Sequence, residues 1–240
     1  MTTTIYKNAN IYSYRQHNFI RDAWFAVDDE TGKISQTGEG RINISADNTI
    51  DVHHQFVMPG IMNAHTHITS VPRDFADKVD ARHPSTRETA TMYAIHNMQD
   101  MIDNGVTYIR NVGAPFDVDI AIREMEKQGF IQGPQIKASG QAISMTGGHG
   151  SDGGYEVDGA DEMRKTVRTA MKNGANNIKM MVTGGVLKNG ETPDDIQLTF
   201  DEVRAGVIEA HHKGFTVAAH AQGNAGIQES VKAGVDTIEH

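Results

Sequence analysis

The chain has 240 residues, of which 38% are hydrophobic and 22% charged, and its formal net charge is −9. This length can bury one sizeable core, and the negative charge argues against a nucleic-acid or anionic-membrane surface, which requires clustered Lys and Arg. The absence of cysteine excludes disulfides, thiolate metal sites and cysteine nucleophiles. Because neither an apolar signal core nor a stretch of transmembrane length is present, we expect a cytoplasmic protein with no membrane partner.

Short β-prone runs separated by turn sequences occupy residues 1–58. The clearest runs are 5–12 and 24–27, and turns are indicated at 28–33 and 38–40. No helical periodicity of useful length occurs in this part of the chain. The pattern therefore predicts a small all-β domain over residues 1–58.

In residues 59–240, predicted helices alternate with predicted strands. Each helix shows apolar residues on one face and ends at a glycine, and capping boxes at Ser85–Glu88 and Thr199–Glu202 mark two helix starts. The further helices are expected near 117–128, around Met163–Met171 and near 225–232. The expected strands are 57–64, 106–110, 135–139, 177–182, 215–220 and 235–240.

This alternation indicates βαβ units, a parallel sheet and right-handed crossovers, and hence an α/β fold. Six strands on their own leave a doubly wound sheet possible. We favour a (β/α)8 barrel of the TIM type because polar residues follow most of the strands at their C-terminal ends, where barrel active sites lie. An open sheet would concentrate its site at one switch point. The domain over residues 59–240 is therefore predicted to be a partial barrel with about six of eight strands.

Four histidines stand at the ends of predicted strands. His65 and His67 are two residues apart, so their imidazoles share one face of the strand, and His220 and His240 end the fifth and sixth strands. Imidazole is a preferred zinc ligand, although a single His-x-His pair is equally explained by solvated side chains. The remaining histidines in loops or on helices are expected to be exposed: His17, His53, His54, His83, His96, His211 and His212.

Lys179 lies inside the apolar strand 178–182, where a lysine is costly unless it is paired or chemically altered. One explanation is a side chain that reaches solvent at the strand end. The other is an amine of lowered pKa that reacts with CO2 to form a carbamate, an anion with two oxygens that can bridge two cations.

Three segments resemble the amidohydrolase superfamily: Met58–His67, the Lys179 strand with 182–185 after it, and Ala233–His240. The similarity is to the imidazolonepropionase-related branch with a carboxylated lysine, which includes dinuclear prolidases and other Xaa-amino-acid carboxypeptidases. The resemblance implies a (β/α)8 barrel with a small β-sandwich built from both termini. It also implies two divalent metal ions, expected to be zinc, with ligands His65, His67, carbamylated Lys179, His220 and His240.

The resemblance further implies a metal-dependent amidohydrolase that cleaves the C–N amide bond of a dipeptide or N-acyl amino acid with a metal-bound hydroxide. His149, in the glycine-rich loop 145–152, is expected to bind the small-molecule substrate or the developing oxyanion, although a flexible polar loop is an alternative. Asn111 stands where relatives commonly carry Asp, and Gln222 where they often show a second His, so no role is carried over to either.

Two other functions remain open: opening of a cyclic amide, as in imidazolonepropionase, and a non-catalytic protein on a barrel scaffold. A bridging lysine disfavours the first, and metal content separates all three. In the superfamily the general base is an aspartate after the eighth strand, a position that lies beyond His240 here. We therefore expect the 240-residue chain alone to be inactive and to need a complementing C-terminal segment or a partner chain, with a homo-oligomer as one possibility.

Overall fold

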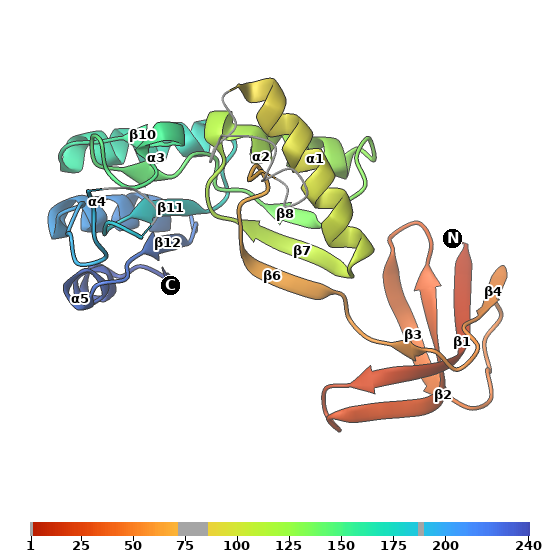
Figure 1. Ribbon diagram of the computed structural model, residues 1–240. Helices are drawn as coiled ribbons and strands as arrows, with labels where there is room; N and C mark the ends of the chain where they lie inside the picture. The colour runs from red at the N-terminus through yellow and green to blue at the C-terminus, as the bar shows by residue number, and fades with distance from the viewer. Residues whose placement is uncertain (1, 72–85, 187–189) are drawn as a thin grey trace. The chain divides into compact units, whose positions relative to one another are not determined.

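The computed structural model describes residues 2–71, 86–186 and 190–240. It divides into two compact units, Met1–Gly60 and Ile61–His240, which are described separately (Figure 1). The division falls two residues beyond the boundary expected from the sequence. In the described part of the chain, no helix is both long and apolar enough to cross a membrane.

Unit 1 is a single mixed five-stranded sheet with the order β3-β2-β1-β4, in which β5 also pairs with β1. Ile5, Trp24 and Ala26 form its small buried core. The indole of Trp24 lies so close to Gly38 that a Cβ there would overlap the ring. The strands are β1 (Thr3–Ser13), β2 (Asn18–Asp28), β3 (Lys33–Glu39), β4 (Asn48–Asp51) and β5 (Phe56–Val57).

The expected first barrel strand, 57–64, differs from the observed one. Val57 pairs in parallel with Ile11 of β1, so it belongs to unit 1. Pro59 and Gly60 interrupt the β structure, and the next strand, β6, runs from Ile61 to Thr66. As a result, His65 lies within β6 instead of following it.

The described part of unit 2 contains eight parallel strands within two sheets, β6-β7-β8 and β10-β9-β11-β12-β13, and six of them are main strands that follow the chain order. The two sheets meet where the amide of Asn176 donates a 2.9 Å hydrogen bond to the carbonyl of Ala138. The short strands β9 (Ile143–Ser144) and β10 (Tyr155–Glu156) were not anticipated. The six main strands are β6, β7 (Val106–Asn111), β8 (Gln135–Lys137), β11 (Ile178–Met181), β12 (Val217–His220) and β13 (Thr237–Glu239).

Five α-helices connect these strands in the described part of unit 2, and α1 lies over β7 (Figure 1). The predicted capping box of α4 is present, with reciprocal hydrogen bonds between Thr199 and Glu202. Ser85 lies outside the described residues, and α1 begins after Thr86, whose side chain accepts from the amide of Thr89. The helices are α1 (Arg87–Asp103), α2 (Val118–Lys127), α3 (Ala160–Asn173), α4 (Phe200–His211) and α5 (Asn224–Ala233), with short 3-10 turns η2 (Pro115–Asp117) and η3 (Ser151–Gly153).

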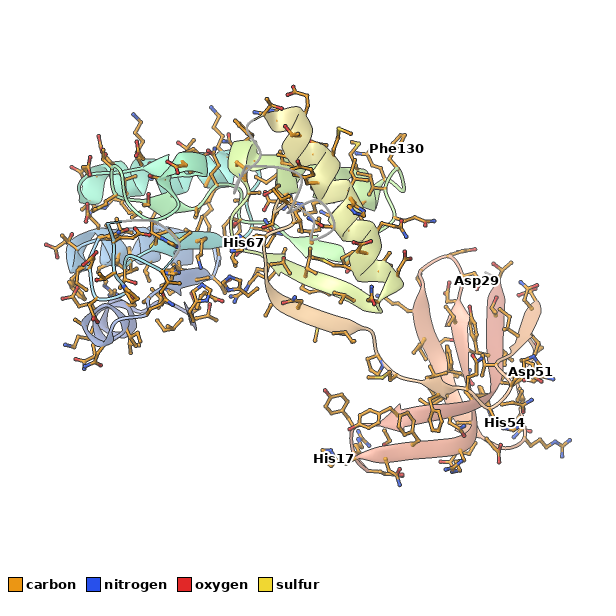
Figure 2. The ribbon with its side chains drawn as sticks, in the orientation of Figure 1. His17, Asp29, Asp51, His54, His67 and Phe130 are labelled. Atoms are coloured by element: carbon orange, nitrogen blue, oxygen red, sulfur yellow. The ribbon has the colours of Figure 1, made fainter. Side chains whose placement is uncertain are left out.

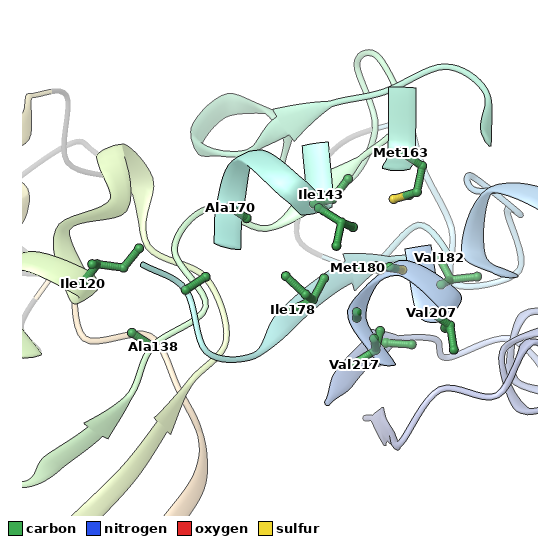
Figure 3. Close-up of a cluster of buried hydrophobic side chains, with 14 of the residues drawn as sticks. Ile120, Ala138, Ile143, Met163, Ala170, Ile178, Met180, Val182, Val207 and Val217 are labelled. Atoms are coloured by element: carbon green, nitrogen blue, oxygen red, sulfur yellow. The ribbon is translucent and has the colours of Figure 1, made fainter. Parts of the chain in front are cut away.

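The hydrophobic core of unit 2 lies between the strands and the inner helix faces. Figure 3 shows strand residues such as Ile178 and Val217 beside Met163 and Ala170 of α3 and Val207 of α4. Alternating strands and helices around this core give the mixed α/β fold that the sequence predicts. The strands of each sheet run parallel, so their C-terminal ends lie along one edge of that sheet.

Candidate active site

Five imidazoles form a continuous chain at the C-terminal ends of the strands. Successive ring centroids are 5.2 Å apart for His67 and His65, 4.8 Å for His65 and His240, 4.8 Å for His240 and His220, and 4.5 Å for His220 and His149. Figure 2 shows His67 between the β6–β8 sheet and the segments that carry β11 to β13. Positions separated by as many as 175 residues in the sequence thus meet at one place.

His65 and His67 direct the same ring nitrogen toward each other. Their Nε2 atoms are 3.3 Å apart. The Nδ1–H of His65 donates to the carboxylate of Glu239 at 2.6 Å, and the Nδ1–H of His67 donates to the carbonyl of Gly113 at 3.3 Å. Because carboxylate and carbonyl oxygens only accept, Nε2 keeps its lone pair in each ring that is neutral. Two facing lone pairs repel unless a metal ion or a shared proton lies between them.

The separation of the two Nε2 atoms is the one that a tetrahedral ion requires. Two Zn–N bonds of about 2.0–2.1 Å at a tetrahedral angle of about 109° place the nitrogens about 3.3–3.4 Å apart. The nitrogens of His65 and His67 are separated by 3.3 Å. These two residues therefore fit a shared divalent metal ion, with Nδ1 hydrogen bonds of the kind that orient metal-bound histidines.

Lys179 is buried beside these rings. Its side chain is 1% exposed, and its Nζ has no hydrogen-bond partner within the described structure. Burial lowers the pKa of Lys179 to about 8, the Arg110 charge acting in the same direction and Glu239 opposing it. The Lys179 side chain therefore does not reach solvent at the strand end.

The imidazoles around Lys179 are held neutral. Burial lowers the pKa of His220 to about 4, with His149, Lys179 and His240 contributing, while the Nε2–H of His220 donates to the carbonyl of Gly184 at 3.2 Å. Desolvation likewise lowers the pKa of His67 to about 4. Burial and the neighbouring charges also lower the pKa of His240. Neutral imidazole is the form that binds a metal ion.

Two charged residues that the sequence did not single out complete this side of the site. Glu239 precedes His240 and accepts from His65, and Arg110 of β7 donates to Glu239 at 2.6 Å. Burial on its own would raise the pKa of Glu239, but hydrogen bonds from Thr237 and His65 and the charges of Arg110 and Lys179 lower it. Glu239 is therefore an anion among cations and imidazoles. The one feature of the sequence that could have identified Glu239 as a site residue is that it directly precedes His240, a candidate metal ligand.

Asn111 follows Arg110 in β7 and supports the other histidine. Its side-chain oxygen accepts from the amide of Ile68 at 3.0 Å, and its Nδ2 donates to the carbonyl of Gly113 at 3.3 Å. That carbonyl also accepts from His67. Asn111 thus fixes the backbone after His67 and the acceptor of the His67 ring.

His149 is anchored by two residues from the segment before α4. Its Nδ1–H donates to Glu191, and its backbone amide donates to the side-chain oxygen of Gln197 at 2.7 Å. Gln197 in turn donates to the second oxygen of Glu191 at 3.0 Å. The ring also lies against Gly185, where a Cβ would overlap it. His149 is therefore fixed in place, in contrast to the flexible-loop alternative.

The structure brings together all six residues that the sequence selected, namely His65, His67, His149, Lys179, His220 and His240. Of the histidines expected to be exposed, His96 is half-buried, His83 lies outside the described residues, and the others are exposed as predicted. Across residues 2–71, 86–186 and 190–240, no three His, Asp or Glu side chains form a metal-ligating group by themselves. Lys179 is the additional donor that the site offers.

The sequence profile of the Amidohydrolase family matches residues 56–240. The chain belongs to the amidohydrolase family. Among solved structures, a Xaa-Pro dipeptidase with bound methionine in its active site is 30% identical, with a TM-score of 0.87 over 100% of this chain and 61% of that one. A putative prolidase of Bifidobacterium longum is also 30% identical, with a TM-score of 0.79 over 100% of this chain and 54% of that one.

A curated relative is the ochratoxinase of Aspergillus niger, 30% identical over 77% of this chain and 43% of the relative. The chain thus spans less than two thirds of the length of each of these three proteins. Family membership agrees with the resemblance to the amidohydrolase superfamily found in the sequence and with the α/β fold.

Proposed function

We propose that the full-length gene product that contains this chain is a metal-dependent hydrolase of C–N amide bonds. The observation that carries the proposal is the pair of facing Nε2 lone pairs of His65 and His67, 3.3 Å apart, beside the buried and unpartnered amine of Lys179. A bound cation relieves the repulsion between the lone pairs, and conversion of the amine to a carbamate supplies that cation with an anionic ligand. The most consistent substrate is a dipeptide or an N-acyl amino acid.

The donor set would divide between two divalent ions. His65 and His67 would hold one, His220 and His240 would hold the other, and Lys179, as a carbamate, would supply an oxygen to each. The carbamate forms when the neutral amine attacks the carbon of CO2 and loses a proton, which leaves one negative charge shared by two oxygens. The pKa of about 8 for Lys179 gives a larger neutral fraction near pH 7 than an exposed lysine has. Two such ions, when bound, supply Lewis-acid polarisation of an amide carbonyl and activation of water.

The protein's own residues position the reactants. His149 is held by Glu191 through Nδ1, which leaves Nε2 for a group of the substrate. The ring of His149 stacks on that of His220 with centroids 4.5 Å apart, so a substrate bound to His149 lies next to the second pair of histidines. With its proton on Nδ1, His149 is thus suited to accept a hydrogen bond at Nε2 from an N–H or O–H group of the substrate.

The names of the relatives favour the dipeptide class. Two of the structures with similar folds are a Xaa-Pro dipeptidase and a putative prolidase, each 30% identical to this chain. A dinuclear site with a bridging lysine also distinguishes this proposal from cyclic-amide opening, which does not need the bridge. We therefore place the substrate among linear amides with a C-terminal amino acid.

Metal analysis and a substrate screen test the proposal together. We expect two zinc ions per chain in the full-length protein, turnover within a library of dipeptides and N-acyl amino acids, and loss of turnover on chelation. Lys179→Met is expected to abolish activity. The matched control is Lys137→Met, because Lys137 lies in β8 and donates to Thr216 at 2.9 Å, away from the histidines.

Other results would identify the alternatives. Turnover of cyclic amides with one metal ion per chain and no turnover of dipeptides would indicate the imidazolonepropionase type. A folded protein that binds no metal and turns over neither class would indicate a non-catalytic role.

A further inference from the structure

The guanidinium of Arg110 contacts two strands: β6, which carries His65, and β13, which carries the carboxylate bound to the His65 ring. Its Nε donates to the carbonyl of Ala64 at 2.6 Å, directly before His65 in β6. Its Nη1 donates to the hydroxyl of Thr237 at 2.9 Å, and its Nη2 donates to Glu239 at 2.6 Å, both in β13. One planar group therefore fixes the backbone next to His65 and the carboxylate that binds the His65 ring.

Both oxygens of Glu239 are engaged. Oε1 accepts from Arg110 and from the hydroxyl of Thr237, each at 2.6 Å, and Oε2 accepts from the Nδ1–H of His65 at 2.6 Å. The side chain of Glu239 is 7% exposed, so water cannot readily replace a lost partner. The carboxylate has one orientation that satisfies all three donors.

We propose that Arg110 and Glu239 form a positioning pair that fixes the ring and the tautomer of His65, so that its Nε2 presents a lone pair to a metal ion shared with His67. This inference rests on the proposed function. A carboxylate bound to Nδ1 keeps the proton on that nitrogen and raises the basicity of the other. Without Arg110 and Glu239, the His65 ring is free to rotate or to carry its proton on Nε2. A proton on Nε2 would prevent that nitrogen from binding a metal ion.

Arg110 and Glu239 could also serve only to cross-link β7 and β13. The two roles differ in what a substitution changes. A cross-link affects the stability of the fold, whereas a positioning pair affects the affinity of the folded protein for a metal ion. Metal affinity measured on folded protein is therefore the informative quantity.

The experiment measures zinc affinity by chelator competition in the full-length protein and its variants Glu239→Gln and Arg110→Met. Glutamine has one acceptor oxygen, so it cannot serve both Arg110 and His65. We expect each variant to bind zinc about 10–100-fold more weakly, the range seen when the hydrogen-bond partners of metal ligands are removed. The absorption spectrum of bound Co²⁺ is also expected to change, because the geometry around the ion is altered.

A second Arg–Glu pair in the same unit is the matched control. Arg168 of α3 and Glu209 of α4 make two 2.8 Å hydrogen bonds on the outer helix surface. Arg168→Met and Glu209→Gln are expected to leave zinc affinity and the Co²⁺ spectrum unchanged. The double variant R110M/E239Q is expected to bind zinc about as weakly as either single variant, because the two residues act as one unit.

Two outcomes would overturn the inference. If folded Glu239→Gln and Arg110→Met proteins bind zinc as tightly as the wild type, the pair is a structural cross-link and the proposed function stands. If the wild-type protein itself binds no zinc or Co²⁺, the proposed function and the inference both fail.

Discussion

The side-chain amide of Asn111 donates a 2.9 Å hydrogen bond to the carboxylate of Asp119, and both side chains are fully buried. The same carboxylate oxygen accepts from the backbone amides of Ser139 and Gly140 at 3.0 and 3.1 Å. Asn111, whose side-chain oxygen accepts from the amide of Ile68, therefore links the segment after His67 to the start of α2 and to the segment after β8. The sequence left the role of Asn111 open, and these contacts give it a structural role in supporting the segment after His67.

Asn111→Asp is expected to destabilise unit 2 by about 3 kcal/mol near pH 7, because two buried carboxylates would face each other where a donor now meets an acceptor. Unfolding in urea measures the change. The matched control is Asn173→Asp, since Asn173 also donates to an aspartate, Asp117, at 3.1 Å but at the surface. The control is expected to change the free energy of unfolding by no more than about 0.5 kcal/mol. Equal effects of the two substitutions would contradict this account.

Asp119 is expected to make stability depend on pH. Burial raises the pKa of Asp119 from 3.8 to about 6, against the hydrogen bonds from Asn111 and from the amides of Gly140 and Ser139. Because the folded-state pKa is the higher one, this contribution is fully present below about pH 4 and is lost as the pH rises through about 6. It amounts to roughly 3 kcal/mol over that interval. Asp119→Asn removes the titration while keeping the shape of the side chain.

The difference in unfolding free energy between the wild type and Asp119→Asn isolates this group from all others. We expect the wild type to gain stability relative to the variant as the pH falls from about 6 to about 4. A relative loss over the same interval would mean that the three N–H donors outweigh burial.

Gly185→Ala is expected to displace the ring of His149, because the added Cβ would overlap the imidazole. If His149 binds substrate, the KM for a dipeptide should rise by about tenfold, corresponding to about 1.4 kcal/mol of lost binding. Val186→Ala, at the adjacent exposed position, is the control and should leave KM unchanged. An unchanged KM in a folded Gly185→Ala protein would argue against substrate binding by His149.

The two residues of the α4 capping box, Thr199 and Glu202, are expected to contribute unequally to the free energy of unfolding. Thr199→Ala should destabilise the protein by about 1 kcal/mol, the usual effect of losing an N-cap. Glu202→Ala should cost more, because Glu202 also accepts from the amide of Gly159 at 2.6 Å, at the N-terminus of α3. Urea unfolding of both variants tests the order of the effects. The reverse order would show that the contact with Gly159 contributes little.

Local patterns predicted much of the fold. Helical spacing identified the buried face of α1, formed by Ala90, Ala94 and Met98, and the capping box at Thr199 marked the start of α4. The alternation of strands and helices also indicated the α/β fold class. These features depend on residues a few positions apart, where periodicity and cap chemistry are informative.

The remaining features depend on contacts between distant positions. Val57 was assigned to the first barrel strand, but its pairing with Ile11 is decided by a partner 46 residues away. The supports of the site were missed for the same reason, since His65 and Glu239 are separated by 174 residues. Lys179 was recognised because a lysine in an apolar strand is costly by itself. Its carbamate stays a prediction.

Trp24 packs over Gly38 in unit 1 and is the single tryptophan of the sequence. All α-helices of the described residues lie in unit 2. Tryptophan fluorescence therefore reports on the first unit, whereas the helical circular dichroism signal reports on the second. The two optical signals, recorded on the same sample, give a direct measure of whether a substitution near His65 acts within its own unit or unfolds both.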